Sequence, residues 1–252
     1  MKLIDQVYII TGATSGMGKA MAILYAEHGA KLVLNGRSEK KGNALVEELK
    51  AVTPNVVFHA GDVGNPELNK ELVTKALTNY GKLNGIVTNA GVLGLGSVTE
   101  ISIEEWHTSL NTNFNAFFYL CKYAIPHIKK EKGTIIANAS IAAFKCFPNH
   151  PIYCASKAAL VALVKQIALD YGPEIRVNAI CPGPVDTPLI WDSAKAFENP
   201  EEAVDNVKDA TLLKRLGTPE DIAKLALFLA SDDASWMTGS AVTIDGGIMA
   251  TR

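Results

Sequence analysis

Short apolar runs alternate with longer segments of helical periodicity along the whole 252-residue chain. The first run, residues 7–10, reads Val-Tyr-Ile-Ile and shows no alternation with polar residues. The segment 19–30 that follows places apolar side chains at helical spacing, at Ala22, Ile23, Ala26 and Ala30. Continuously apolar strands are typical of a parallel sheet covered by helices on both faces. The alternation therefore predicts an α/β fold.

The same pattern runs to the end of the chain. We expect strands at residues 7–10, 31–34, 56–59, 86–88, 134–138, 176–180 and 241–244, and helices at 19–30, 39–51, 66–80, 106–130, 152–171 and 219–231. Right-handed crossovers then give a doubly wound, Rossmann-like parallel sheet of seven strands, in a single domain spanning residues 1–252. Ligands of such folds bind beyond the carboxyl ends of the strands.

Composition excludes several classes of protein. Lys and Arg number 24 against 26 Asp and Glu, a net charge of −2 that argues against a nucleic-acid partner. We see neither a secretory signal nor an apolar run of the ~18–20 residues that a membrane span needs. The four cysteines follow no zinc or redox spacing, and the histidines no metal spacing. We therefore expect a cytoplasmic protein with no metal site and no membrane or nucleic-acid partner.

A glycine-rich segment, Thr11 to Gly18, follows the first strand and opens the first helix. Its glycines, spaced G-x-x-x-G-x-G, permit a tight turn and let a diphosphate approach the backbone. The helix start supplies free N–H groups and partial positive charge. This context predicts a dinucleotide-binding loop, although the spacing differs from G-x-G-x-x-G.

The end of the second predicted strand bears on the choice of cofactor. It lies about twenty residues beyond the glycine loop, where the adenine ribose of a dinucleotide falls. An NAD site usually has a carboxylate there, but this chain has Asn35, Arg37 and Ser38. A guanidinium grips a 2′-phosphate well. We therefore favour NADP(H), with NAD(H) possible. Asp62 and Val63 are expected beside the adenine, although Asp62 could instead cap the next helix.

Tyr153 and Lys157 lie four residues apart in a predicted helix, so both face the same way. A free tyrosine has a pKa near ~10, and a nearby ammonium lowers it. The phenol could then exchange a proton with a substrate oxygen. Ser140 precedes Tyr153 by thirteen residues at the end of a predicted strand, where its hydroxyl could hold the same oxygen.

From Thr11 to Gly247 the chain resembles the classical short-chain dehydrogenase/reductase family. The motifs that carry the resemblance are the glycine loop, Asn89-Ala90-Gly91, Trp106 with Asn113 seven residues later, Ser140, Tyr153-x-x-x-Lys157, Asn178 to Gly183 with Val185-Asp186-Thr187, and Asp245-Gly246-Gly247. Thr88 departs from the family, which usually has Asn there, and Ser15 stands where many NADP-preferring members have a basic residue.

The resemblance implies a role for each matching residue. The catalytic set would be Asn113, Ser140, Tyr153 and Lys157. Tyr153 would act as acid and base, Lys157 would lower its pKa, and Asn113 would anchor a water for proton relay. The cofactor residues would be Gly12, Thr14, Ser15, Gly16, Met17, Gly18, Asn35, Arg37, Ser38, Asp62, Val63, Asn89, Ala90, Gly91, Tyr153, Lys157, Pro182, Gly183, Val185 and Thr187. Family members are usually tetramers and sometimes dimers, so we expect an interface formed by the helices at Trp106 and Ile152.

The segment 184–213 lacks strand character and is expected to form a substrate lid. Its apolar residues are Leu189, Ile190, Trp191 and Phe197, and we expect Leu93, Leu95, Ala142, Phe144, Cys146, Phe147 and His150 across the pocket. The predicted function is reduction of a neutral ketone or oxidation of a secondary alcohol. Alternatives are a 3-oxoacyl-(acyl-carrier-protein) reductase, an NAD-dependent sugar-alcohol dehydrogenase and a non-enzymatic nucleotide sensor.

Overall fold

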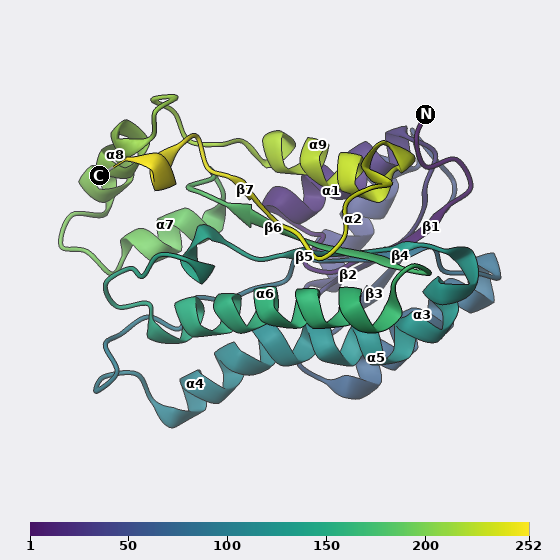
Figure 1. Cartoon of the computed structure of the whole chain (residues 1–252), viewed down its shortest axis with the longest axis horizontal. Helices are drawn as coiled ribbons and strands as arrows, with labels where there is room; N and C mark the ends of the chain where they lie inside the picture. The colour runs from purple at the N-terminus through teal and green to yellow at the C-terminus, as the bar shows by residue number, and fades with distance from the viewer. Residues whose placement is uncertain (252) are drawn as a thin grey trace.

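The seven predicted strands form one parallel sheet in the computed structural model, which describes residues 1–251 (Figure 1). The strands are β1 Val7–Ile10, β2 Lys31–Gly36, β3 Val56–Ala60, β4 Gly85–Thr88, β5 Thr134–Asn138, β6 Arg176–Pro182 and β7 Ala241–Ile244. Their order in the sheet is β3-β2-β1-β4-β5-β6-β7, and every pair is parallel. The predicted doubly wound α/β fold is confirmed.

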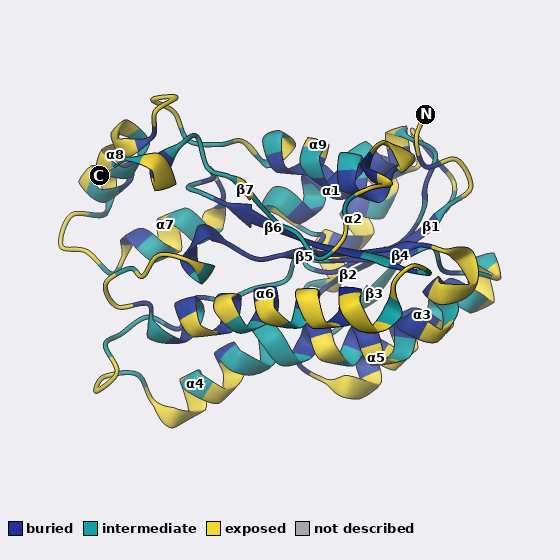
Figure 2. Cartoon of the chain, viewed as in Figure 1, coloured by how far each residue is buried: buried dark blue, intermediate teal, exposed yellow. Residues whose placement is uncertain are grey.

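Helices cover both faces of the sheet (Figure 1). One layer holds α1 Gly16–Glu27, α2 Glu39–Leu49 and α9 Pro219–Ala230; the other holds α3 Pro66–Tyr80, α5 Ala116–Ile128 and α6 Pro151–Tyr171. Successive side chains of a strand point to opposite faces, so each strand contributes side chains to the core on both faces of the sheet. In β1, Tyr8 and Ile10 belong to the core beneath α1 and α9, whereas Val7 and Ile9 belong to the core beneath α3 and α5. The five inner strands are accordingly almost fully buried, whereas the edge strands β3 and β7 are mostly half-buried (Figure 2).

The helix expected at residues 106–130 is interrupted. It consists of α4 Ile103–Leu110, a π-helical turn at Asn111–Asn115, and α5, which ends at Ile128 two residues after Pro126. A helix over most of this range is confirmed, and the π turn inside it was not predicted because periodicity does not reveal a single i→i+5 turn. Such turns are frequent at functional sites, and this one carries Asn113.

The lid segment contains two helices that the sequence analysis did not predict, α7 Pro188–Ala194 and α8 Pro200–Ala210. Both begin with proline, and Asn199 caps α8 by accepting a hydrogen bond from the backbone N–H of Glu202. These two features are helix-start signals, so local sequence could have located both helices.

Among residues 1–251, one helix, α6, has the length and hydropathy of a membrane span. Half of its most apolar window is buried inside the protein, and the helix carries the buried Lys157. A core helix of a globular protein has the same composition, so this feature is weak support for a membrane segment.

Candidate functional site

The glycine loop lies at the centre of the sheet, where β1 is flanked by β2 and β4. The strand order changes direction here: it runs β1-β2-β3 to one side and β4-β5-β6-β7 to the other. Ligands of doubly wound folds bind at this switch point. Ser15 precedes α1 without a side-chain capping bond, and the first turn of α1 contains no acidic residue. The N–H groups at this helix end are therefore free to bind an anion.

The glycines of this loop are required by close backbone packing. Gly12 and Gly16 have φ of +62° and +50°, in the left-handed region that favours glycine. Gly18 is different: a Cβ there would lie 2.2 Å from the carbonyl oxygen of Gly12 and 2.5 Å from Nδ2 of Asn89. Gly18 therefore allows the close packing of the helix start against Gly12 and Asn89, and it does not line the cleft.

An elongated cleft of about 320 Å³ runs from this loop across the carboxyl ends of the strands. The predicted cofactor residues that line it are Gly12, Thr14, Ser15, Gly16, Met17, Asn35, Arg37, Asp62, Val63, Asn89, Ala90, Gly91, Tyr153, Lys157 and Thr187. Pro182, Gly183 and Val185 line a second cavity beside it. The loop N–H groups, Arg37 at one end and Lys157 at the other suit the phosphates and ribose of a nicotinamide dinucleotide.

Of the three polar residues at the end of β2, two form hydrogen bonds within the protein and one lies free at the cleft. The buried Asn35 donates hydrogen bonds from Nδ2 to the carbonyl oxygens of His59 and Gly61, so its amide holds β2 against β3. Ser38 caps α2 by accepting from the Lys41 N–H, and it is absent from the cleft lining. Arg37 is exposed at the cleft wall, which leaves its guanidinium free for a ligand.

Asp62 is also exposed at the cleft. Its carboxylate accepts the Gly64 N–H at 2.9 Å and turns the chain after β3. The alternative assignment of Asp62 as the cap of α3 is wrong, because Asn65 accepts the Glu67 N–H at that position.

A chain of hydrogen bonds ties the first, fourth and fifth strands together beneath the cleft. Thr11 accepts the Asn89 N–H, and Asn89 Nδ2 donates to the Gly12 carbonyl oxygen at 3.1 Å. Asn138 Nδ2 donates to Asn89 Oδ1 at 2.8 Å. The hydroxyl of Thr88, the residue that departs from the family, is buried without a hydrogen-bond partner. The network therefore forms without the usual asparagine at that position.

Tyr153 lies where the cleft meets the second cavity. It lines both, together with Met17, Ala139, Thr187 and Leu189. Burial raises the pKa of its phenol, and the neighbouring Ser140 hydroxyl only partly offsets this. Lys157 is not among the groups that shift this pKa, so its expected lowering effect stays a prediction. At neutral pH the phenol keeps its proton, as an acid requires.

Lys157 is buried, and no acidic side chain in the described part of the chain contributes to the shift of its pKa. Its ammonium donates a hydrogen bond to the Asn138 carbonyl oxygen at 2.8 Å and lies 5.6 Å from the centre of the Tyr153 ring. Burial lowers the pKa of Lys157 to about 8. The lysine is therefore poised to change charge near physiological pH.

The side chain of Asn113 connects the π turn to its surroundings. Its Oδ1 accepts the Val92 N–H at 2.8 Å, and its Nδ2 donates to the Val92 carbonyl oxygen and to Ser156 Oγ. A small internal cavity of about 10 Å³, the size of one water, is lined by Asn113, Lys157 and Asn138. Asn69, Thr88 and Asn138 each have a buried side-chain oxygen without a partner, and all three line this cavity.

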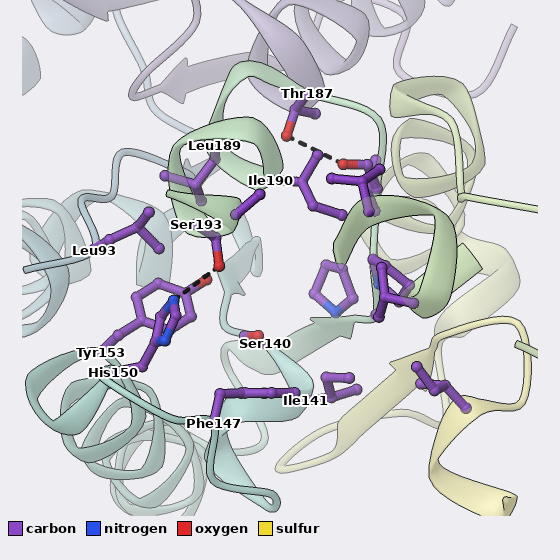
Figure 3. A pocket seen from close by; sticks show the side chains of 18 of the residues that line it. Leu93, Ser140, Ile141, Phe147, His150, Tyr153, Thr187, Leu189, Ile190 and Ser193 are labelled. Atoms are coloured by element: carbon purple, nitrogen blue, oxygen red, sulfur yellow. Dashed lines mark hydrogen bonds between the residues drawn. The ribbon is translucent and has the colours of Figure 1, made fainter. Parts of the chain in front are cut away.

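The second cavity, of about 200 Å³, is bounded by Ser140, Tyr153 and the lid helices (Figure 3). Its walls are mainly apolar: Leu93, Ile141, Phe147, Leu189, Ile190, Phe197, Val204, Val207 and Ile248. No Asp, Glu, Lys or Arg of the described chain lines it. The cavity therefore suits a neutral, apolar molecule placed against Tyr153 and Ser140.

Several predicted pocket residues lie elsewhere. Phe144 and Cys146 are exposed, and Trp191 is exposed with its indole N–H donating to Asp186. Ala142 is buried, and neither it nor Leu95 lines the cavity. The apolar character of these side chains could not distinguish a pocket wall from core or surface.

His150 lines the second cavity, as the sequence predicted, but its hydrogen bond to the lid could not be predicted from any motif. The structure buries its imidazole in the second cavity between Tyr153 and the lid. Nδ1 lies 2.5 Å from the Pro148 carbonyl oxygen, and Nε2 lies 2.8 Å from Ser193 Oγ (Figure 3). Across residues 1–251, no cluster of three or more His, Cys, Asp or Glu side chains could hold a metal ion.

Comparisons with known proteins cover nearly the whole chain. Residues 12–249 match the family model described as Enoyl-(Acyl carrier protein) reductase. The chain is 36% identical to a 3β-hydroxysteroid dehydrogenase of Mediterraneibacter gnavus, over 96% of this chain and 94% of that protein. It is 33% identical to a 3-oxoacyl-(acyl-carrier-protein) reductase of Thermotoga maritima, over 99% and 100%. The crystal structure of levodione reductase superposes with a TM-score of 0.95 at 30% identity, covering 100% of both chains.

Proposed function

The chain belongs to the short-chain dehydrogenase/reductase family, and the relatives named above are oxidoreductases. On that premise, we propose that it interconverts a neutral, largely apolar ketone and its secondary alcohol with NADP(H). The observation that carries the proposal is the position of Tyr153, which lines both the cleft and the apolar cavity. A group in this position can reach a substrate oxygen while the cofactor occupies the cleft.

Ser140 and Tyr153 bind and protonate the substrate oxygen. Ser140 Oγ accepts the Ala142 N–H at 3.1 Å, which leaves the hydroxyl proton free for donation to a carbonyl oxygen. Tyr153 donates its proton to the same oxygen in reduction and accepts one in oxidation. The reduced nicotinamide supplies the hydride when it is bound.

Lys157 and Asn113 return a proton to Tyr153. The ammonium near the Tyr153 ring stabilises a phenolate as it forms. The small cavity beside Lys157 accommodates one water among the unpaired oxygens of Asn69, Thr88 and Asn138. This water would connect Lys157 to the π turn at Asn113, the relay that the family resemblance implies.

Arg37 supports the preference for NADP(H). No carboxylate occupies the end of β2, and the Arg37 guanidinium is exposed at that wall of the cleft. Asn35 is occupied with β3, so Arg37 would carry most of the 2′-phosphate recognition. NAD(H) use remains the alternative that the assay below distinguishes.

The lid argues against an acyl-carrier-protein substrate. α8 covers the apolar cavity through Ala203, Val204 and Val207, and its outer face carries Glu201, Glu202, Asp205 and Asp209 against a single Lys208. A negative rim repels an acidic carrier. The apolar walls equally disfavour a sugar alcohol, and the retained Tyr153 and Lys157 disfavour a nucleotide sensor.

We also propose a cytoplasmic homotetramer or homodimer that pairs through the α4–α5 and α6 helices. Ile103 on α4 and Phe118 on α5 are exposed apolar side chains on these helices. All four cysteines are free thiols, which suits a reducing compartment.

A spectrophotometric screen tests the function. Purified protein is mixed with neutral cyclic and linear ketones and with NADPH or NADH, and the loss of reduced-nicotinamide absorbance is followed. We expect turnover of apolar ketones with NADPH preferred. The absence of turnover with every ketone, and with the matching alcohols and oxidised cofactors, would refute the proposed function.

The lowered pKa of Lys157 predicts a pH-dependent cofactor affinity. The ammonium is present below about pH 8 and is lost as the pH rises through its pKa. Since a hydrogen bond from a charged donor is worth about 1.5–3 kcal/mol, we expect the affinity for NADPH to fall roughly tenfold above that pH. Fluorescence titration of NADPH between pH 6 and pH 10 measures this. Lys157→Met, which cannot titrate, should bind weakly with a flat profile, and a wild-type fall retained in this variant would contradict the assignment.

A further inference from the structure

Ser193 lies on the lid helix α7 and faces the apolar cavity on the same side as His150 and Tyr153 (Figure 3). Its hydroxyl is 2.8 Å from Nε2 of His150, a residue 43 positions earlier in the chain. Apart from Ser140 and Tyr153, the polar side chains that line the cavity are Thr187, His150 and Ser193. Thr187 donates its hydroxyl to the Val185 carbonyl oxygen, so it offers the cavity no proton.

The tautomer of His150 follows from its other neighbour. Nδ1 lies 2.5 Å from the Pro148 carbonyl oxygen, and a carbonyl oxygen can only accept. Nδ1 therefore carries the proton. No carboxylate lines the cavity to pair with a charged imidazole, so we assign the neutral ring, in which Nε2 carries no proton and accepts.

This tautomer fixes the orientation of the Ser193 hydroxyl. Because Nε2 accepts, the Ser193 hydroxyl must donate to it, and its only proton is used in that bond. Ser193 Oγ forms no other side-chain hydrogen bond within the described residues. Its lone pairs are thus directed to the cavity as an acceptor, in a wall that is otherwise almost entirely apolar.

From this arrangement we infer that Ser193 Oγ is a second recognition point for the substrate and selects a hydrogen-bond donor. The substrate class becomes an apolar ketone that carries a hydroxyl group away from the reacting carbonyl, or the corresponding diol. An ether or second carbonyl at that place can only accept a hydrogen bond. Its oxygen would face Ser193 Oγ, which also only accepts, and the two would form no hydrogen bond. This inference rests on the proposed function, because it assumes that the carbonyl lies against Tyr153 and Ser140.

The test compares matched probe ketones. The isomers of hydroxycyclohexanone supply a donor at different distances from the carbonyl, methoxycyclohexanones supply only an acceptor, and methylcyclohexanones supply neither. In the wild-type protein we expect at least one hydroxy isomer to exceed its methyl and methoxy analogues in kcat/KM by about tenfold, the factor that one net hydrogen bond typically contributes. Thermal-shift titration with the corresponding diols should show the same preference without turnover.

The variants separate recognition from a merely structural role. In Ser193→Ala we expect the hydroxy-to-methyl ratio of kcat/KM to fall to about one, whereas Ser193→Thr keeps the hydroxyl and should keep the ratio. In His150→Leu the Ser193 hydroxyl loses its acceptor and becomes free to donate to the substrate. The kcat/KM for the methoxy ketone should therefore rise relative to that for the methyl ketone. Ser235→Ala, an exposed serine outside both cavities, is the matched control and should keep the wild-type ratio.

Two results would overturn the inference. If methylcyclohexanones are reduced but no hydroxy isomer is preferred, Ser193 does not select a donor, and the proposed function stands. The same conclusion follows if Ser193→Ala lowers kcat/KM for all three probes equally, since that is the effect of a loosened lid. If no cyclohexanone is reduced with either cofactor, and the screen of other ketones also fails, the proposed function itself is refuted.

Discussion

Tyr153→Phe is expected to lower kcat for ketone reduction by about 10³-fold, within the range typical of a lost general acid. The substitution removes one hydroxyl and keeps the ring that forms the wall between the cleft and the apolar cavity. The affinity for NADPH should change by less than about threefold, and the melting temperature should not fall, because phenylalanine keeps the packing of the ring at the boundary of the two cavities. Steady-state absorbance assays and fluorescence titration of NADPH measure the two effects separately.

Tyr171→Phe is the matched control for this prediction. It makes the same chemical change at the end of the same helix, α6, at a residue that lines neither cavity. Its kcat should equal that of the wild-type protein. If Tyr153→Phe keeps more than a tenth of the wild-type kcat, the assignment of Tyr153 as the acid is wrong.

Arg37→Asp is expected to lower the NADPH-to-NADH ratio of kcat/KM by about 100-fold. Part of the loss is the charge-assisted bond between guanidinium and 2′-phosphate, and the rest is repulsion between the new carboxylate and that phosphate. NADH lacks this phosphate, and the new carboxylate can accept hydrogen bonds from its ribose hydroxyls, which favours NADH binding. Initial rates at several concentrations of each cofactor give the ratio.

Lys40→Asp controls for general electrostatics around the cleft. It makes the same change in net charge on the neighbouring helix α2, at an exposed residue that does not line the cleft. Its cofactor ratio should change less than about threefold, since exposed charges interact weakly through water. An Arg37→Asp ratio no different from that of Lys40→Asp would remove Arg37 from the phosphate site.

The sheet could be predicted from the sequence because strands buried on both faces leave a strong local signal. Residues 7–10 are Val-Tyr-Ile-Ile and residues 134–138 have Ile-Ile-Ala at their centre, and each run is confirmed as a strand. The doubly wound arrangement followed from the handedness of the crossovers, whereas the order of the strands was established only by the structure. The π turn at Asn111–Asn115 could not be predicted, because the change in hydrogen bonding leaves the surrounding apolar periodicity intact.

The candidate site was predicted less completely than the fold. Tyr153, Lys157 and Ser140 occur in recognisable patterns, so they could be selected before their geometry was known. The contact between His150 and Ser193 joins residues 43 positions apart with no shared motif, and only the fold brings them together. The pKa of Tyr153 likewise depends on burial, and the four-residue spacing between Tyr153 and Lys157 carries no information about burial.

Isotope transfer from cofactor to product tests the central claim most directly. An apolar ketone is reduced with NADPH that carries deuterium at C4 of the nicotinamide, on either face in separate reactions, and the alcohol is examined by NMR. We predict that one of the two labels appears quantitatively at the carbinol carbon, and that Tyr153→Phe gives essentially no labelled alcohol in the same time. Alcohol that forms without deuterium from either label, or at an undiminished rate in Tyr153→Phe, would contradict the account.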